Sequence, residues 1–387
     1  MKVLIYRYGS ICEPDVMMAF DMLNVEHKEI DVEVTRKNVS SKETLDIVSK
    51  ALDEEKFDAV FSINYYPILS AVCNIYKVRY ISWTVDSPVL ELNSNTLSNE
   101  WNRTFVFDRA EYEYFKEVGQ NHIFHLPLAV NVNRLDKYLS KTDPNPKFGG
   151  DVALVGSLYT EKNPYERFAK KDSYLGGYLE AIMQAQSRIY GEFLLPKLVS
   201  DEQLKEFKEN LPGFYTPPED FTIDDKMTMC LLYLGSNVAV IERRRLLTML
   251  GERYNVNLYT GSGSKGIPVK NCGLVKSLEE MPLVFRDAKI NLNFTLKSIR
   301  TGIPQRVFDV LGCGGFLITN YQQEIAELLP NDLVMFGGDE ELMDLTEYFL
   351  SHEKERKEIA MEGKADVTKN HTIERRMVEM FELAFSI

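Results

Sequence analysis

The chain has 387 residues, which exceeds the size at which a single hydrophobic core usually stops growing, so the sequence predicts two domains. With 44% hydrophobic and 27% charged residues, the composition is typical of a soluble globular protein rather than a disordered one. The formal net charge of -13 disfavours nucleic acid and anionic membrane surfaces as partners. The five cysteines have no metal-ligand spacing, and no apolar run approaches the length of a membrane span, so we expect a cytoplasmic protein with reduced thiols.

Apolar runs of strand length alternate with amphipathic helical segments through the first third of the chain. The candidate strands are VLIY at 3–6, IDVEV at 30–34, DAVFSI at 58–63, RYISWTV at 79–85 and TFVFD at 104–108. Such alternation is typical of a parallel sheet with helices on both faces. Residues 137–150, KYLSKTDPNPKFGG, then have the prolines, glycines and mixed charge of a linker. We therefore predict a first Rossmann-like domain over residues 1–140.

A second series of strands begins with DVALVG at 151–156 and predicts a second Rossmann-like domain over residues 151–370. Residues 163–235 interrupt it, and the apolar spacing of Tyr174, Leu179 and Ile182 indicates a helical insert. The closing segment 371–387 predicts a helix that packs back on the first domain. The predicted fold class is therefore α/β, with two tandem Rossmann-like domains that face a central cleft.

The segment RTGIPQRVFDVLGCGGFLITN, residues 300–320, follows a predicted strand of the second domain. Open α/β sheets bind ligands at the carboxyl ends of their strands, so this segment lies at the cleft. Pro304 suits the first position of a helix, whose free amides and dipole favour an anion such as a diphosphate. Lys297, Arg300 and Arg306 add three cations in an otherwise acidic chain. The pattern indicates a phosphate site at this helix.

The helix that starts here also has a polar face, because Gln305 and Arg306 lie four and three residues before Asp309. One interpretation is that Asp309 only pairs with Arg306 on a solvated surface. The other is that Asp309, one turn beyond a phosphate site, accepts hydrogen bonds from the two hydroxyls of a ribose. The predicted position in a cleft between two nucleotide-type domains favours the second.

The stretch GIPQRVFDVLGCGGFLITNYQQEIAELL, residues 302–329, resembles the nucleotide-binding core of the CgeB-type spore-maturation proteins, a branch of the GT-B glycosyltransferases. In that family a G-x-P-x-R-x-F-[ED]-x-x-x-x-G-G-F-x-x-T run is usual. The similarity extends to YISWTVDSPV at 80–89, TFVFDRAEYEYF at 104–115, HLPLAVN at 125–131 and VGSLY at 155–159. It implies a bacterial enzyme of hexosyltransferase type. Such an enzyme would move a sugar from a nucleotide-sugar donor, a UDP-sugar, to a protein, glycan or other hydroxyl acceptor. The second domain would hold the donor, the first would hold the acceptor, and no further cofactor is implied.

The resemblance also assigns roles to residues. Asp309 matches the second acid of the paired-acid motif of many retaining GT-B enzymes, which binds the donor ribose, whereas Thr301 stands where that motif has its first acid. The turn at Gly156 and Ser157 resembles a loop whose amides approach the donor phosphates, although a plain strand-to-helix connection has the same pattern. Gly273 resembles the position where the base lies against the backbone. The expected donor-binding residues are Gly156, Ser157, Gly273, Lys297, Arg300, Gly302, Ile303, Gln305, Arg306 and Asp309.

Asp86 ends a strand of the first domain on the cleft side, which suits a base that takes a proton from an acceptor hydroxyl. It could equally cap the next helix, because Ser87 and Pro88 follow it. No Asp-x-Asp pair closes a predicted strand, so we expect no metal site and a metal-independent reaction. Two other classes remain open: a non-catalytic nucleotide or nucleotide-sugar binding protein, and an interaction scaffold on a decayed transferase fold.

Overall fold

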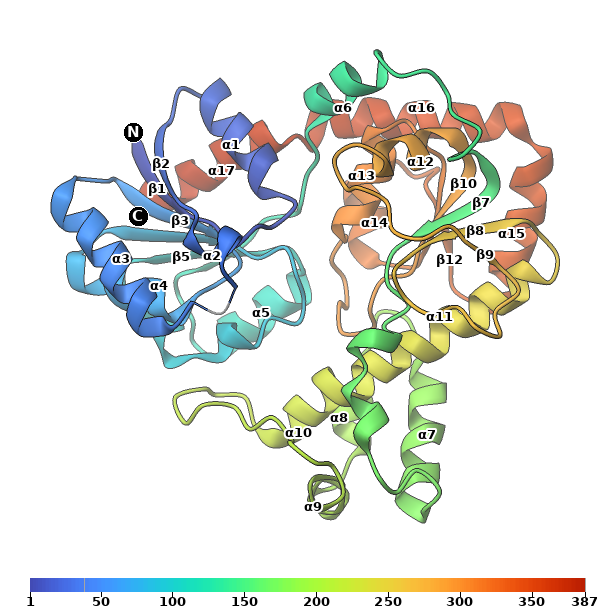
Figure 1. Cartoon of the computed structure of the whole chain (residues 1–387), viewed down its shortest axis with the longest axis horizontal. Helices are drawn as coiled ribbons and strands as arrows, with labels where there is room; N and C mark the ends of the chain where they lie inside the picture. Colours follow the sequence, from blue (N-terminus) through green and yellow to red (C-terminus); the bar gives the residue numbers. More distant parts are fainter. Residues whose placement is uncertain (38, 387) are drawn as a thin grey trace.

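A computed structural model describes residues 1–37 and 39–386 of the chain, so the last position of the predicted closing segment lies outside the described residues. It contains two α/β domains side by side, with a group of helices below the space between them (Figure 1). Each domain has one sheet of six parallel strands. The predicted fold class, two Rossmann-like domains in one α/β chain, is confirmed. Within this described part, no helix has both the length and the apolar character needed to cross a membrane.

The first sheet has the strand order β2-β1-β3-β4-β5-β6. Its central strand β3 is buried along its whole length, which explains the continuous apolar run in its sequence. The strands are β1 (Lys2–Tyr6), β2 (Glu26–Ile30), β3 (Ala59–Ile63), β4 (Arg79–Trp83), β5 (Asn102–Val106) and β6 (Ile123–His125). The expected strand at 30–34 is wrong, because the chain pairs with β1 over 26–30 and then turns into the short helix α2 (Val32–Thr35). As an edge strand, β2 tolerates the polar sequence EHKEI, which hid it from an apolar pattern.

Helices cover both faces of the first sheet, and the closing helix is one of them. They are α1 (Glu13–Met22), α3 (Ser41–Glu54), α4 (Pro67–Tyr76), α5 (Arg109–Glu117) and α17 (Ile373–Phe385). α6 (Val132–Leu139) instead lies on the connection to the second domain, where it contacts α12 (Met281–Asp287). α17 packs against α1, with the rings of Phe20 and Phe381 5.5 Å apart. The guanidinium of Arg79 lies 4.6 Å from the ring of Phe385. The end of the chain therefore lies on the first domain, after the second domain is complete (Figure 1).

The second sheet has the order β12-β11-β10-β7-β8-β9. Its first strand in the chain, β7, lies between β10 and β8, so the order of the strands reverses between β7 and β10. A crevice at the carboxyl ends of the strands on either side of such a reversal is the usual ligand site of open α/β sheets. The strands are β7 (Gly150–Val155), β8 (Val256–Tyr259), β9 (Lys270–Asn271), β10 (Ala288–Asn293), β11 (Leu317–Asn320) and β12 (Val334–Phe336).

The helices of the second domain include one that the apolar pattern did not reveal. They are α11 (Gly235–Gly251), α12 (Met281–Asp287), α13 (Gln305–Gly312), α14 (Gln323–Leu328), α15 (Asp339–Ser351) and α16 (Glu353–Asn370). The unpredicted helix is α16, whose sequence is largely charged. It packs against α13, where Gly363 leaves room for the side chain of Leu311. The helix α16 is therefore buried through the close approach of Gly363 to α13 rather than through a wide apolar face.

The insert between β7 and β8 has a hydrophobic core of its own. Its helices are α7 (Tyr174–Gln186), α8 (Leu195–Leu198), α9 (Asp201–Glu209) and α10 (Asp225–Thr228), with a π-helical turn, Met229–Leu234, before α11. Tyr174, expected on the buried face of α7, is 89% exposed, and Leu175 points inward instead. Residues 220–222 extend beneath the first domain, where Asn95 N donates to Asp220 O and Thr222 N donates to Asn93 O. The insert therefore contacts both domains.

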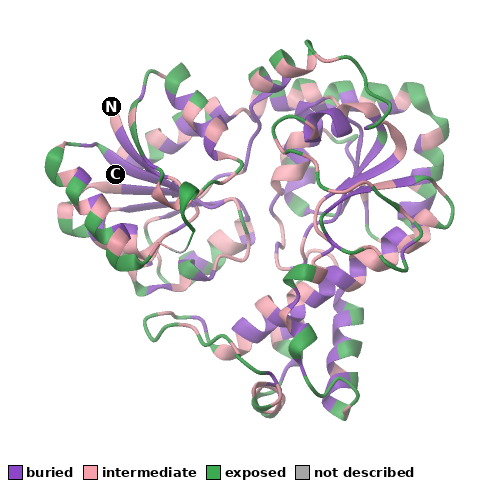
Figure 2. Cartoon of the chain, viewed as in Figure 1, coloured by how far each residue is buried: buried purple, intermediate pink, exposed green. Residues whose placement is uncertain are grey.

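The two domains also share one hydrophobic core (Figure 2). It joins Val130 and Leu135 at the end of the first domain to Phe308 and Leu311 of α13. A Cβ atom at Gly312 would lie 2.7 Å from Val130 Cγ2, so the close approach of α13 requires glycine there. The helix that carries Arg306 and Asp309 thus packs directly on the segment that leaves the first domain.

We expect Gly315→Ala to destabilise the protein, because the new Cβ atom would lie 2.3 Å from the carbonyl oxygen of Phe285. Relieving such a contact requires a backbone shift, so the free energy of unfolding should fall by about 1–3 kcal/mol, measured by urea denaturation. Gly177→Ala in α7 is the matched control, since no atom lies within 4 Å of its new Cβ. It should raise stability by about 0.5–1 kcal/mol. Equal stability of the two variants would contradict the packing described for Gly315.

Candidate functional site

The reversal point of the second sheet carries an arginine that sequence analysis did not select. Arg243, on α11, donates hydrogen bonds to the carbonyl oxygens of Ser157 and Phe294, which follow β7 and β10. Its guanidinium also lies 4.7 Å from the ring of Tyr159, and burial lowers its pKa. Among the described residues, no ion pair of Arg243 with a carboxylate is formed. Its charge is therefore available to an anion in the crevice.

Arg306 and Asp309 lie beside this point on α13. The Arg306 guanidinium is 3.6 Å from Asp309 and 5.0 Å from the ring of Phe285, and Gln305 Nε2 donates to Asp309 Oδ1 at 2.9 Å. Burial lowers the pKa of Arg306, and the nearby charge of Arg243 acts in the same direction. Burial also raises the pKa of Asp309, against the opposing charge of Arg306. Two cations and one carboxylate thus share a partly buried site at the cleft.

Pro304 precedes the helix instead of occupying its first position, with φ -71° and ψ 155°. This corrects the expected start of α13 by one residue, and the extended backbone at Pro304 is the conformation of an N-cap position. The N-terminus of α13 still lies at the carboxyl edge of the sheet, so the general placement of the helix is unchanged.

The three cations expected to converge on one anion do not do so. Lys297 is buried, with Nζ 2.8 Å from Glu242 and 3.1 Å from the ring centroid of Tyr190. Burial lowers the pKa of Lys297 to about 8. Arg300 instead donates to the carbonyl oxygen of Ala110 in the first domain. The connection between β10 and α13 turns these side chains in different directions, so Arg306 is the one of the three beside Asp309.

The backbone of residues 300–302, expected to approach the donor, is occupied by Asp108 of the first domain. The Asp108 carboxylate accepts hydrogen bonds from the amides of Arg300, Thr301 and Gly302 at 2.9, 3.1 and 3.2 Å. A Cβ atom at Gly302 would lie 2.7 Å from the Asp108 Cα atom. Ile303 is buried in the shared core. In this structure Gly302 and Ile303 therefore form part of the contact between domains.

Thr301 lies between two buried carboxylates, with its hydroxyl 2.7 Å from Asp108 and 2.8 Å from Glu324. Glu324 is also 2.8 Å from His125 Nε2. An acid at position 301 would add a third carboxylate beside these two, and like charges at such distances oppose one another. These contacts give a physical reason for threonine rather than an acid at position 301.

The remaining expected donor residues lie in turns after β7 and β9. The Ser157 hydroxyl donates to Glu161 at 2.6 Å and accepts from the Tyr159 amide at 2.7 Å, so it stabilises the turn that starts at Gly156. Gly273 has φ +78°, a conformation that side chains rarely adopt. The Gly273 segment continues toward Ser277, which borders the space beside Asp309.

The space beside Asp309 is small in this structure. Its walls include Cys12 and Asp15 of the first domain and Ser277 and Gln305 of the second. It has a volume of about 20 Å³, room for little more than one water molecule. As it stands, this space is too small for a nucleoside.

Asp86 lies in the cleft on the first-domain side and is exposed. Its carboxylate accepts a hydrogen bond from Asn64 Nδ2 at 2.7 Å, and the amide of Val85 donates to Asn64 Oδ1 at 3.0 Å. It does not cap the next helical turn, whose N-cap residue is Val89. Burial raises the pKa of Tyr159 in the second domain's β7 turn, and the charge of Asp86 adds to this shift.

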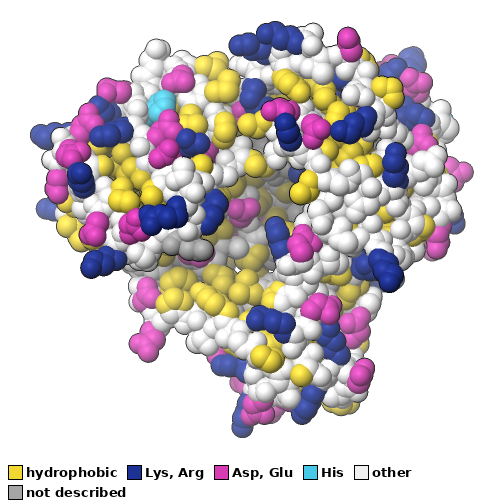
Figure 3. Space-filling model, viewed as in Figure 1, with side chains coloured by type: hydrophobic (Ala, Val, Ile, Leu, Met, Phe, Trp, Pro, Cys, Tyr) yellow, Lys and Arg dark blue, Asp and Glu magenta, His cyan; other side chains and the backbone are white. Residues whose placement is uncertain are grey.

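Figure 3 shows a hollow between the two domains, with hydrophobic side chains gathered along its lower edge toward the insert. Among residues 1–37 and 39–386, no group of three or more His, Cys, Asp or Glu side chains is placed to hold a metal ion.

Comparisons with known proteins agree with this arrangement. Residues 242–382, from α11 to α17, match a family model described as glycosyl transferase-like. No curated protein sequence matches the chain. Among solved structures, HepE of Anabaena in complex with UDP and glucose is similar over 100% of both chains, with 10% identity and a TM-score of 0.54.

Two further structures have the same architecture. The β-glucosyltransferase of phage T4 matches over 100% of both chains, with 11% identity and a TM-score of 0.54. A UDP-forming trehalose-phosphate synthase from Burkholderia xenovorans matches over 99% of this chain and 98% of its own, with 11% identity and a TM-score of 0.56. At these identities the likeness concerns the fold: the chain has the GT-B fold of glycosyltransferases, two Rossmann-like domains around a cleft.

Proposed function

We propose that this protein is a glycosyltransferase of hexosyltransferase type that takes its sugar from a UDP-linked donor. The observation that carries the proposal is the site formed by Arg243, Arg306 and Asp309 at the reversal point of the second sheet. A leaving diphosphate needs positive charge, which two partly buried guanidinium groups would supply, and a ribose needs a hydrogen-bond acceptor, which Asp309 would supply. The glycosyl transferase-like match over 242–382 supports the same assignment.

The proposed donor site uses some expected residues and adds one. Arg243 joins Gln305, Arg306 and Asp309, and the turns at Gly156 and Gly273 would approach the phosphates and the base. Solved structures with the same fold contain UDP or UDP-glucose, which makes UDP-glucose the first donor to test. The acceptor would be a protein, a glycan or another hydroxyl compound in the cytoplasm, in keeping with the resemblance to the CgeB-type branch.

Donor binding in this proposal is coupled to domain movement. The space beside Asp309 is too small for a nucleoside, and the amides of residues 300–302 are held by Asp108. The structure would therefore represent a closed arrangement, from which the segments around Cys12 and Ser277 separate to admit the donor. Asp86 would then take the proton of the acceptor hydroxyl as the cleft closes again.

We expect UDP-glucose hydrolysis, measured as UDP release without an added acceptor, to be unaffected by a chelator. The reason is that the guanidinium groups of Arg243 and Arg306 would neutralise the leaving diphosphate in place of a divalent cation. The control is addition of magnesium or manganese to chelator-treated protein, which should leave the rate unchanged. Activity that disappears with chelator and returns with either metal would contradict metal independence.

A further inference from the structure

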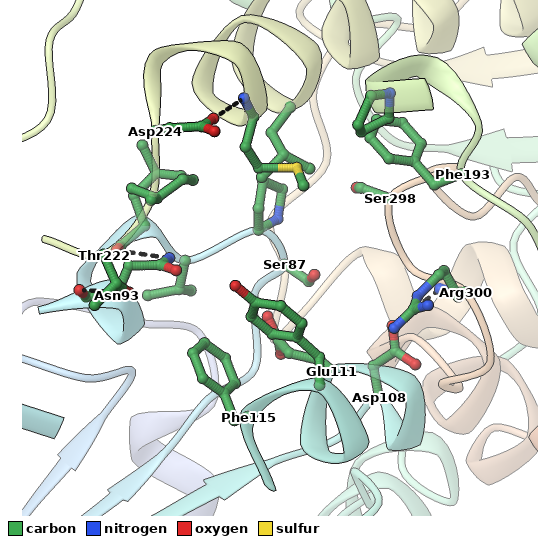
Figure 4. A pocket seen from close by; sticks show the side chains of 18 residues that line it. Ser87, Asn93, Asp108, Glu111, Phe115, Phe193, Thr222, Asp224, Ser298 and Arg300 are labelled. Carbon is green, nitrogen blue, oxygen red and sulfur yellow. Dashed lines mark hydrogen bonds between the residues drawn. The ribbon is translucent and has the colours of Figure 1, made fainter. Parts of the chain in front are cut away.

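A second and larger pocket lies between the first domain and the insert, away from Asp309. It has a volume of about 310 Å³, within the range of pockets that bind small molecules. α5 of the first domain forms one wall, and α10 with the segment before it forms the wall opposite (Figure 4). Ser87, the residue after Asp86, lies between these walls, and Ser298 and Arg300 close the side toward the second domain. The pocket therefore ends beside the proposed base.

The walls of this pocket are mainly apolar. Phe115 lies on α5, and Phe193, Ile223, Met227 and Leu231 come from the insert. The insert keeps its position through two backbone hydrogen bonds to the first domain, at 2.9 and 2.7 Å, formed by residues 220–222 with residues 93–95. Aromatic and aliphatic walls around a pocket of this volume favour an apolar group the size of a ring.

One polar group in the pocket has no partner. Glu111, in the first turn of α5, has its Oε2 atom buried, and this atom forms no hydrogen bond with any described residue. A buried polar atom without a partner is unfavourable, so its presence in a pocket indicates a ligand group that completes it. Its neighbour Asp108 is already satisfied by three amides of the second domain.

We propose that this pocket is the acceptor site, and that it binds an uncharged molecule with a ring-sized apolar part and a hydroxyl group that hydrogen-bonds to the Glu111 carboxyl. The inference rests on the proposed function and adds the class of acceptor. In a longer acceptor, this hydroxyl or a second one would extend past Ser87 and lie at Asp86. The insert thereby contributes to acceptor selection, although it belongs to the donor domain.

The charges around the pocket favour a neutral ligand. An anion would face Asp108 and Asp224 as well as Glu111. A cation would face Arg300, and the two carboxylates are already engaged, because Asp108 accepts from three amides and Asp224 caps α10 by accepting from the Met227 amide. Burial, with the charge of Asp108, raises the pKa of Glu111 to about 8, against the opposing charge of Arg300. At neutral pH Glu111 is therefore mostly an uncharged acid that both donates and accepts a hydrogen bond. Above pH 8 it ionises and loses its donor.

Three small molecules with the same ring and different polar ends test this proposal: 2-phenylethanol, 2-phenylethylamine and phenylacetate. Binding at millimolar concentration is measured by saturation-transfer NMR on the full chain. We expect 2-phenylethanol to bind more tightly than the amine and the acid, and to lose affinity as the pH rises through about 8. Glu111→Gln should retain this binding at neutral pH and remove its pH dependence, because glutamine keeps a neutral donor and acceptor.

Two further variants separate the pocket from other surfaces. Glu111→Leu should weaken 2-phenylethanol binding by about three- to tenfold, since it removes one hydrogen bond, and Met227→Trp should abolish binding because the larger side chain fills the pocket. Glu117→Gln, on the exposed end of the same helix, is the matched control and should change nothing. Titration with UDP on the same samples reports the donor site and the fold independently.

The proposal is overturned if none of the three compounds binds, if a charged compound binds best, or if Met227→Trp leaves binding intact while UDP titration shows a folded protein. Normal UDP binding together with any of these results removes the acceptor assignment and leaves the donor site in place. Failure of UDP binding in the parent protein, with 2-phenylethanol still bound at Glu111, removes the proposed donor instead.

Discussion

Arg306→Ala is expected to weaken UDP binding by about ten- to a hundredfold while leaving uridine binding nearly unchanged. The reason is that Arg306 would contact the diphosphate, and a charge-assisted hydrogen bond contributes roughly 1.5–3 kcal/mol. Isothermal titration with UDP and with uridine gives both affinities. Arg244→Ala is the matched control, because Arg244 lies on α11 next to Arg243 but donates outward to the carbonyl of Lys265.

Asp309→Ala extends the same test to the nucleoside. Because the ribose is common to UDP and uridine, this variant should weaken both by a similar factor, again about ten- to a hundredfold. The contrast between the two variants matters more than either value. If Arg306→Ala or Asp309→Ala bound UDP as tightly as the parent protein, α13 would not be the donor helix.

Asp86→Asn is expected to lower the rate of UDP-glucose hydrolysis by about 10²- to 10⁴-fold, the usual contribution of a general base. Water replaces the acceptor in this assay, so the measurement does not require the natural acceptor. UDP affinity should stay the same, because Asp86 lies on the first domain and outside the space beside Asp309.

Asp53→Asn serves as the control for Asp86→Asn, since Asp53 is exposed, accepts a hydrogen bond from Tyr76 and lines neither of the two pockets described above. Its hydrolysis rate should equal that of the parent protein. An unchanged rate in Asp86→Asn would show that another group takes the proton. Glu111 is the next carboxyl to examine in that case.

The fold was predictable because the alternation of apolar strands and amphipathic helices is local information. The strand Ala59–Ile63 and the helix Gln305–Gly312 show this directly, because the order of apolar residues in each matches the way in which that element is buried. The spacing of Gln305, Arg306 and Asp309 likewise requires only helical geometry to bring these side chains together. Prediction succeeded where neighbours in sequence are neighbours in space.

The rest depended on contacts between distant segments. β2 is specified by pairing with β1 rather than by its polar sequence, and α16 is held by a small contact with α13. Arg243 was missed because the insert separates β7 from α11 by nearly eighty residues and hides the contact between them. Lys297 was expected to face an anion, but it pairs with Glu242 on that same distant helix, a contact that the local sequence does not reveal.

Titration of the parent protein with UDP, followed by incubation with UDP-glucose and measurement of UDP release, tests the central claim most directly. The account predicts saturable UDP binding, slow release of UDP from UDP-glucose, and loss of the binding in Asp309→Ala. UDP binding without any UDP release would identify a nucleotide-binding protein rather than a transferase. Absence of UDP binding, in a protein whose thermal unfolding transition shows that it is folded, would contradict the donor site at Arg243, Arg306 and Asp309.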